Sequence, residues 1–198
     1  DDVDWRSDSL NLAVKDINTK LMASDSVINV ALRNNDMYAF MSTPDKIDSL
    51  PIKVGNLTEI LSQQINAREV DVVQIQQAMP RFNLIMKAGP KNLLSQYLST
   101  MDQSFNRLSL KMSNDSLINL SAQVNEYKMG TTRIDTINLS ANQYDKILMY
   151  NASIGNRPGT LDDFARVTLD GYLADDLVSA HLQQQNIAGE EGYNIGAL

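Results

Sequence analysis

Few side chains in this chain could carry out chemistry, and the most reactive of them is a single histidine. His181 is the only histidine of the 198 residues, so a Ser-His-Asp triad or a zinc site would have to use it. The Gly-x-Ser-x-Gly elbow that presents a serine nucleophile is absent from the sequence. His181 stands between Ala180 and Leu182 in an alternating apolar run, which places its ring on the opposite, polar face of a strand. We therefore predict a solvent-facing histidine without a catalytic role.

Three pairs of adjacent carboxylates are the other side chains that could act as general acids, general bases or cation ligands. They are Asp162-Asp163, Asp175-Asp176 and Glu190-Glu191. Catalytic carboxylates face each other across a cleft at a set separation, and calcium loops space their ligands regularly, whereas these pairs are only neighbours in sequence. We interpret them as solvated charges in turns.

Glycine and cysteine patterns add no site. The nine glycines form neither a Gly-x-Gly-x-x-Gly fingerprint nor a P-loop, the two patterns that cradle phosphate groups. The chain contains no cysteine, which excludes disulfides, thiolate metal sites and cysteine nucleophiles. The sequence therefore predicts a protein that is not an enzyme, with no catalytic residue, no cofactor and no metal site.

The composition is that of an acidic globular domain. Seventeen Lys plus Arg against 24 Asp plus Glu give a net charge of −7, so no diffuse positive field is available for a phosphate backbone and we expect no nucleic-acid partner. No apolar run approaches the ~20 residues of a membrane span. The chain begins at Asp1 rather than at a methionine, and we expect it to be a soluble piece of a longer protein.

Alternation of apolar and polar residues is the main structural signal. It runs over Leu10–Val14, Phe82–Met86, Leu108–Met112, Ile118–Val124, Ile137–Ala141, Leu148–Ile154, Val167–Leu173 and Val178–Leu182. Such segments are half-buried strands, and the short turns between them favour successive antiparallel pairing. One face of the sheet should therefore be apolar, and its candidate residues are Leu110, Met112, Leu120, Ala122, Leu139, Ala141, Leu169 and Leu182.

The middle of the chain differs, because it contains three short helix candidates. Apolar residues at three-to-four spacing predict an amphipathic helix over residues 57–65. Residues 69–78 fit either a helix or a strand, and we favour a helix that ends before Pro80. Pro90 opens a third helix over residues 91–101.

These patterns predict a mainly β (α+β) fold: an antiparallel meandering sheet, with about three short helices in the middle. Along the chain we expect a β segment at 1–55, a helical segment at 56–103 with one strand near 81–88, and an antiparallel meander at 104–198. The three segments should form one continuous domain. The apolar face ends either in a closed core or in an open groove, and periodicity alone does not separate the two.

Two stretches resemble a known family. Residues 78–98, which read AMPRFNLIMKAGPKNLLSQYL, resemble a segment of the TamB (translocation and assembly module) family in its Bacteroidetes branch. Residues 133–139 (RIDTINL), 150–152 (YNA) and 192–197 (GYNIGA) follow in the order that this family shows. The resemblance covers about residues 78–198, and its motifs are packing patterns.

The resemblance implies an internal segment of a long periplasmic protein that an N-terminal helix anchors in the inner membrane. The sheet of this AsmA-like family curls into an open trough, apolar inside and polar outside. Phospholipid acyl chains would lie against the trough while the lipid moves towards the outer membrane, so the implied function is non-enzymatic lipid transport in envelope biogenesis.

Two alternatives remain open at this point. The family name implies a scaffold that assembles outer-membrane β-barrel proteins, with a β-barrel assembly-type partner engaged through a strand edge. A hydrolase or carbohydrate-binding domain is a third class, which predicts a concave polar cleft with convergent carboxylates or aromatic rings.

Overall fold

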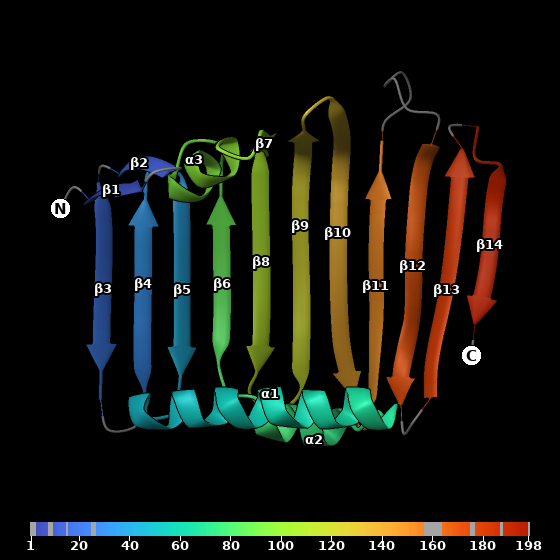
Figure 1. The fold of residues 1–198 in the computed structure, drawn as a ribbon, viewed down its shortest axis with the longest axis horizontal. Coiled ribbons are helices and arrows are strands. Elements are labelled where there is room, and N and C mark those ends of the chain that lie inside the picture. Colours follow the sequence, from blue (N-terminus) through green and yellow to red (C-terminus); the bar gives the residue numbers. More distant parts are fainter. Residues whose placement is uncertain are drawn as a thin grey trace.

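The chain folds into one wide, open antiparallel sheet with helices at both ends of its strands (Figure 1). The computed structural model describes residues 3–7, 10–14, 16–24, 27–156, 164–174, 177–186 and 188–197. Within these residues the sheet has twelve strands in the order β14-β13-β12-β11-β10-β9-β8-β6-β5-β4-β3, and the short β7 pairs with β9. A separate two-stranded sheet consists of β1 (Val3–Ser7) and β2 (Leu10–Val14).

Apart from β7, the strands of the large sheet follow one another in chain order, as the alternating sequence predicts. The first group comprises β3 (Ile17–Ala23), β4 (Ile28–Asn34), β5 (Met37–Thr43), β6 (Asn83–Ala88), β7 (Gln103–Ser104) and β8 (Arg107–Asn114). The second comprises β9 (Ile118–Met129), β10 (Thr132–Tyr144), β11 (Ile147–Gly155), β12 (Phe164–Ala174), β13 (Leu177–Asn186) and β14 (Glu191–Ala197). The prediction of a mainly β, antiparallel and open architecture with three helices is confirmed.

Two connections of this meander carry the helices. The connection from β5 to β6 holds a short 3₁₀ turn, η1 (Ile47–Ser49), followed by α1 (Leu50–Ala67) and α2 (Val72–Ala78). The connection from β6 to β8 holds α3 (Leu93–Ser99). Because β5 and β6 run in opposite directions, the two connections leave from opposite ends of the sheet, which is where Figure 1 shows the helices.

Local chemistry explains where these helices begin. A proline in its first turn lets α1 start at Leu50, earlier than the expected residue 57, because that position needs no N–H donor. The Asp71 side chain accepts a hydrogen bond of 2.8 Å from the backbone N–H of Gln74, and this cap makes residues 72–78 a helix rather than a strand. Asn92 and Ser95 form a reciprocal capping box at the start of α3.

Buried polar side chains fix the helices to the sheet. The Nδ2 of Asn114, at the end of β8, donates hydrogen bonds of 3.1 Å to the carbonyls of Gln76, Met79 and Pro80. At the opposite end, the Oδ1 of Asn34 accepts a 2.7 Å bond from the N–H of Leu93. Asparagines thus supply the contacts that hold α2 and α3 in place.

An ion pair supports the start of α1. The Asp45 carboxylate, 6% exposed, accepts hydrogen bonds of 2.8 and 2.9 Å from the Lys53 ammonium and one of 2.8 Å from the N–H of Arg81. Burial by itself raises the pKa of Asp45, but these hydrogen bonds and charges outweigh it and leave that pKa below its ordinary value. Through its hydrogen bond from Arg81, Asp45 ties the β5–α1 connection to the chain entering β6.

The buried apolar core is small and lies at the two ends of the strands. One cluster consists of Met37, Ala88 and Phe105, against which Leu93 and Leu98 of α3 pack. Buried apolar residues elsewhere are Ile28, Val72 and Ile118. Beyond Ile118, no apolar side chain in the described part of the chain is buried.

Candidate functional site

The eight apolar-face residues that the sequence singles out lie on one face of the sheet, in two adjacent rows that cross the strands. Cross-strand pairing places Met112, Leu120 and Ala141 in one row. The same pairing places Leu110, Ala122, Leu139, Leu169 and Leu182 in the next, with Ala152 between Leu139 and Leu169. The structure brings all eight together on a single surface, the apolar face.

Each row continues across the whole sheet. The first row reads Leu21, Val30, Met41, Leu84, Met112, Leu120, Ala141, Tyr150, Gly171, Ala180 and Ala197. The second reads Thr19, Leu32, Ala39, Met86, Leu110, Ala122, Leu139, Ala152, Leu169, Leu182 and Ile195. Neither row contains a charged residue. With strands ~4.8 Å apart, the face runs for roughly 50 Å across the sheet.

Much of the apolar face is accessible to solvent. The exposed fraction is 41% for Leu139, 39% for Leu182 and 60% for Leu21, values far above those of a closed core. Surface apolar residues scattered singly are ordinary, but a continuous exposed patch marks a site of interaction. The open-groove alternative therefore describes this face, and the closed core is confined to the strand ends.

The helices cover only part of the face. Leu93 and Leu94 of α3 pack on its rim near Met37, and α2 buries Val72 at the opposite end of the strands. In Figure 1, α1 crosses the strand ends while the middle of the strands stays uncovered between α1 and α3. The open part is therefore a strip that runs across the strands, from one edge of the sheet to the other.

Two hollows in this strip are almost entirely apolar. One, of about 360 Å³, is lined chiefly by Ile137, Leu139, Ala152, Val167 and Leu169 on β10, β11 and β12. The other, of about 390 Å³, lies between α3 and the sheet and is lined by Met37, Met86, Leu93, Leu94 and Tyr97. Both are large enough for a segment of hydrocarbon, and neither offers a charged group to fix an orientation.

Tyr150 is a polar side chain within the first row, and it packs over Gly171 of the neighbouring strand. The Tyr150 hydroxyl donates a 2.7 Å hydrogen bond to the carbonyl of Ser179, two strands away on β13. The ring thereby lies across Gly171, where a Cβ atom would overlap both the Ser179 carbonyl and the Tyr150 hydroxyl. The glycine makes room for the ring, and the hydroxyl is satisfied within the sheet.

The structure places His181 away from this face. His181 lies on the polar face, with ring nitrogens 2.7 Å from the Asn194 Oδ1 and 3.3 Å from the Asp170 Oδ1. The hydrogen bond to Asn194, with that to Asp170, raises the pKa of His181 above its ordinary value. Glu190 and Glu191 are exposed, and the pairs Asp162-Asp163 and Asp175-Asp176 lie outside the described residues.

Sequence reasoning missed the contribution of the first strands to the face. Leu21, Val30 and Met41 extend the first row over β3, β4 and β5. The apolar parity of β3 and β4 is readable in the sequence, but β5 carries Tyr38 and Phe40 on its other face, which hides the alternation. No sequence signal marks the crossing of Tyr150 over Gly171.

No helix in the described ranges is long and apolar enough to cross a membrane, and those same residues contain no cluster of three potential metal ligands. Comparison with known proteins finds no matching family model, no matching curated protein and no matching solved structure.

Proposed function

We propose that this chain is a non-enzymatic segment of a periplasmic envelope-biogenesis protein of the TamB type, and that phospholipid acyl chains move along its apolar face towards the outer membrane. The observation that carries the proposal is the continuous, uncharged and solvent-accessible apolar face that crosses eleven strands. The resemblance of residues 78–198 to that family supports the same function and adds an inner-membrane anchor elsewhere in the full-length protein.

The mechanism is physical, because no bond is made or broken. Each CH₂ group that leaves water for the apolar face contributes roughly 0.8 kcal/mol, while the headgroup remains in solvent. Movement requires that this affinity be spread evenly, so that a chain slides rather than lodges. The second row, in which Ala122 and Ala152 alternate with leucines, provides such a shallow surface.

Phospholipid in extracts of the purified chain tests the proposal. The chain is purified without detergent, and organic extracts are analysed by mass spectrometry for phospholipid per mole of protein. Leu139→Asp puts a charge on the apolar face, and Ser140→Asp puts the same charge on the polar face one residue away. We expect bound phospholipid in the wild type and in Ser140→Asp, and its loss in folded Leu139→Asp. Equal lipid content in both variants, or none in the wild type, contradicts the proposal.

A second candidate function is a scaffold for outer-membrane β-barrel proteins, and the edge of the sheet favours it. Among the strands that the structure describes, β14 pairs only with β13, and all seven of its residues are exposed. An exposed edge strand offers backbone N–H and C=O groups to an added strand of a β-barrel assembly-type partner. A Gly196→Pro substitution on β14, opposite His181 on the polar face, removes one backbone N–H of this strand without changing a side chain of the apolar face. It should weaken capture of a β-barrel substrate but leave lipid content unchanged if the scaffold function holds.

A further inference from the structure

The polar face of the sheet, opposite the apolar face, has an uneven distribution of charge. Strands β3 to β8 contain no Asp or Glu, although the whole chain has a net charge of −7. Their cations, all exposed, are Lys20, Arg33, Lys87, Arg107 and Lys111. Cross-strand pairing places all five on the polar face, and none of them takes part in an ion pair within the described residues. The part of the polar face formed by β3 to β8 is therefore a cationic patch on an acidic protein.

Three of these cations surround one hydroxyl. Lys87 on β6 pairs directly with Ser109 on β8, and Arg107 and Lys111 stand two residues to either side of Ser109 on the same face. Strand geometry puts the Cα atoms of Lys87 and of either β8 cation ~8 Å apart. Lys87, Arg107 and Ser109 line a hollow of about 660 Å³, in which Gln123 adds an amide. The arrangement can neutralise a bound carboxylate from several sides.

One acid borders this hollow, and it is already engaged. The Asp36 carboxylate accepts hydrogen bonds of 2.9 Å from the N–H of Lys91 and 2.7 Å from the Nδ2 of Asn92. The hydrogen bonds of Asp36 therefore go to the start of the α3 connection and not to the three cations. The described lining of the hollow holds no pair of carboxylates that could hydrolyse a glycosidic bond.

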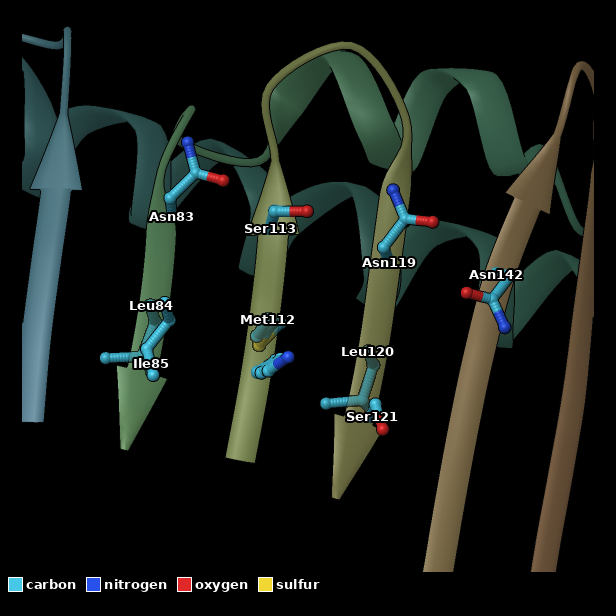
Figure 2. A pocket seen from close by; sticks show the side chains of 10 residues that line it. Asn83, Leu84, Ile85, Met112, Ser113, Asn119, Leu120, Ser121 and Asn142 are labelled. Carbon is cyan, nitrogen blue, oxygen red and sulfur yellow. The ribbon is translucent and has the colours of Figure 1, made fainter. Parts of the chain in front are cut away.

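A row of neutral polar side chains adjoins the cations. Asn83, Ser113, Asn119 and Asn142 face one another across β6, β8, β9 and β10, and Figure 2 shows them along one side of the sheet. They line a second hollow of about 340 Å³ together with Ile85, which is 39% exposed. Of these four polar side chains only that of Asn119 bonds to another described residue, the carbonyl of Leu117 at 3.2 Å. The others are available to a ligand.

The two hollows lie one after the other along β8, because Arg107 to Ser109 line one and Lys111 to Ser113 line the other. We infer that these two hollows together bind an acidic polysaccharide. The three cations receive the sugar carboxylates, the amide and hydroxyl row receives the sugar hydroxyls, and Ile85 contacts the apolar side of a sugar ring. An anionic membrane would use the cations alone, which leaves the neutral row without a role. The inference concerns the face opposite the lipid strip and does not depend on the proposed function.

Calorimetric titration of the whole chain with a polyuronate of about ten sugars tests this inference. Neutral dextran of the same length, monomeric galacturonate, double-stranded DNA and vesicles with 30% phosphatidylglycerol serve as comparison ligands. The test variant replaces Lys87, Arg107 and Lys111 with Gln. The matched control replaces Lys46, Arg68 and Lys146 with Gln, three exposed cations off the polar face, and therefore has the same net charge.

We expect the polyuronate to bind the wild type and the control, and to bind the test variant about ten- to a hundred-fold more weakly, with the wild-type affinity falling as salt rises. Dextran should bind far more weakly, and the monomer more weakly than the polymer. Tighter binding of DNA or vesicles than of polyuronate overturns the inference, as does equal binding of monomer and polymer or equal loss in both variants. Absence of polyuronate binding to the folded wild type overturns it as well.

Discussion

Replacement of Leu139 by alanine measures directly whether the apolar face is open. Full burial of a leucine side chain contributes roughly 1.5–3 kcal/mol, and Leu139 keeps 41% of its surface exposed. Its cross-strand neighbours are Ala122 and Ala152, so truncation leaves a dent in an open surface rather than an enclosed cavity. We therefore expect Leu139→Ala to lower the free energy of unfolding by about 1–2 kcal/mol. A leucine in a closed core would lose about 2–5 kcal/mol.

The control for this experiment is Phe105→Ala. Phe105 is 3% exposed and packs in the cluster beneath α3, so its truncation should lower the free energy of unfolding by about 3–5 kcal/mol. Urea denaturation followed by circular dichroism gives both values, and an unchanged m-value shows that the unfolding reaction is the same. A loss at Leu139 as large as that at Phe105 would refute the open face.

Three further substitutions or titrations test other contacts of the structure. Asn114→Ala removes three hydrogen bonds to carbonyls of the α2 connection. It should lower the free energy of unfolding by about 2–4 kcal/mol and speed amide exchange in α2. A loss below about 1 kcal/mol would contradict the role of Asn114 in holding α2 in place. Gly171→Ala should lower the free energy of unfolding, measured by urea denaturation, by more than about 2 kcal/mol. Gly55 is an exposed helical position with open space around it, so Gly55→Ala should raise that free energy by about 0.5–1 kcal/mol. Equal effects of the two substitutions would contradict the close packing at Gly171. The His181 ring, whose nitrogens face the Asn194 oxygen and a carboxylate on β12, should titrate above its ordinary pKa of about 6.5 by NMR. Its contribution to stability is complete below the unfolded pKa and is lost as the pH rises through the folded value, so a pKa at or below the ordinary value contradicts the arrangement.

The sequence predicted the strands and the faces on which their side chains lie well, because apolar and polar residues alternate along a half-buried strand. Leu120 and Leu139 illustrate this, since their places on the apolar face follow from the alternation alone. The start of α1 at Leu50 was harder to predict, because Leu50, Ile52 and Val54 alternate as in a strand, and the proline in the first turn is what favours a helix there.

Coverage of the apolar face could not be predicted from the sequence. It depends on where α1, α2 and α3 are fixed, and the fixing groups are Asn34 and Asn114, whose partners lie 59 and up to 38 residues away. An asparagine next to a turn looks the same whether it faces water or clamps a distant helix. The cationic patch could not be predicted from the sequence for the same reason, because Lys87 and Ser109 become neighbours only when β6 pairs with β8.

Site-specific photo-crosslinking in the cell tests the central claim, that acyl chains lie on the apolar face, most directly. A benzophenone side chain is introduced at Leu139 in one variant and at Ser140 in a second, so that adjacent positions report on opposite faces of β10. After irradiation, the purified protein is analysed by mass spectrometry for covalent phospholipid. Adducts at position 139 and none at position 140 are the predicted result. Equal adducts at both positions, or none at 139 while the protein is folded, would contradict the account.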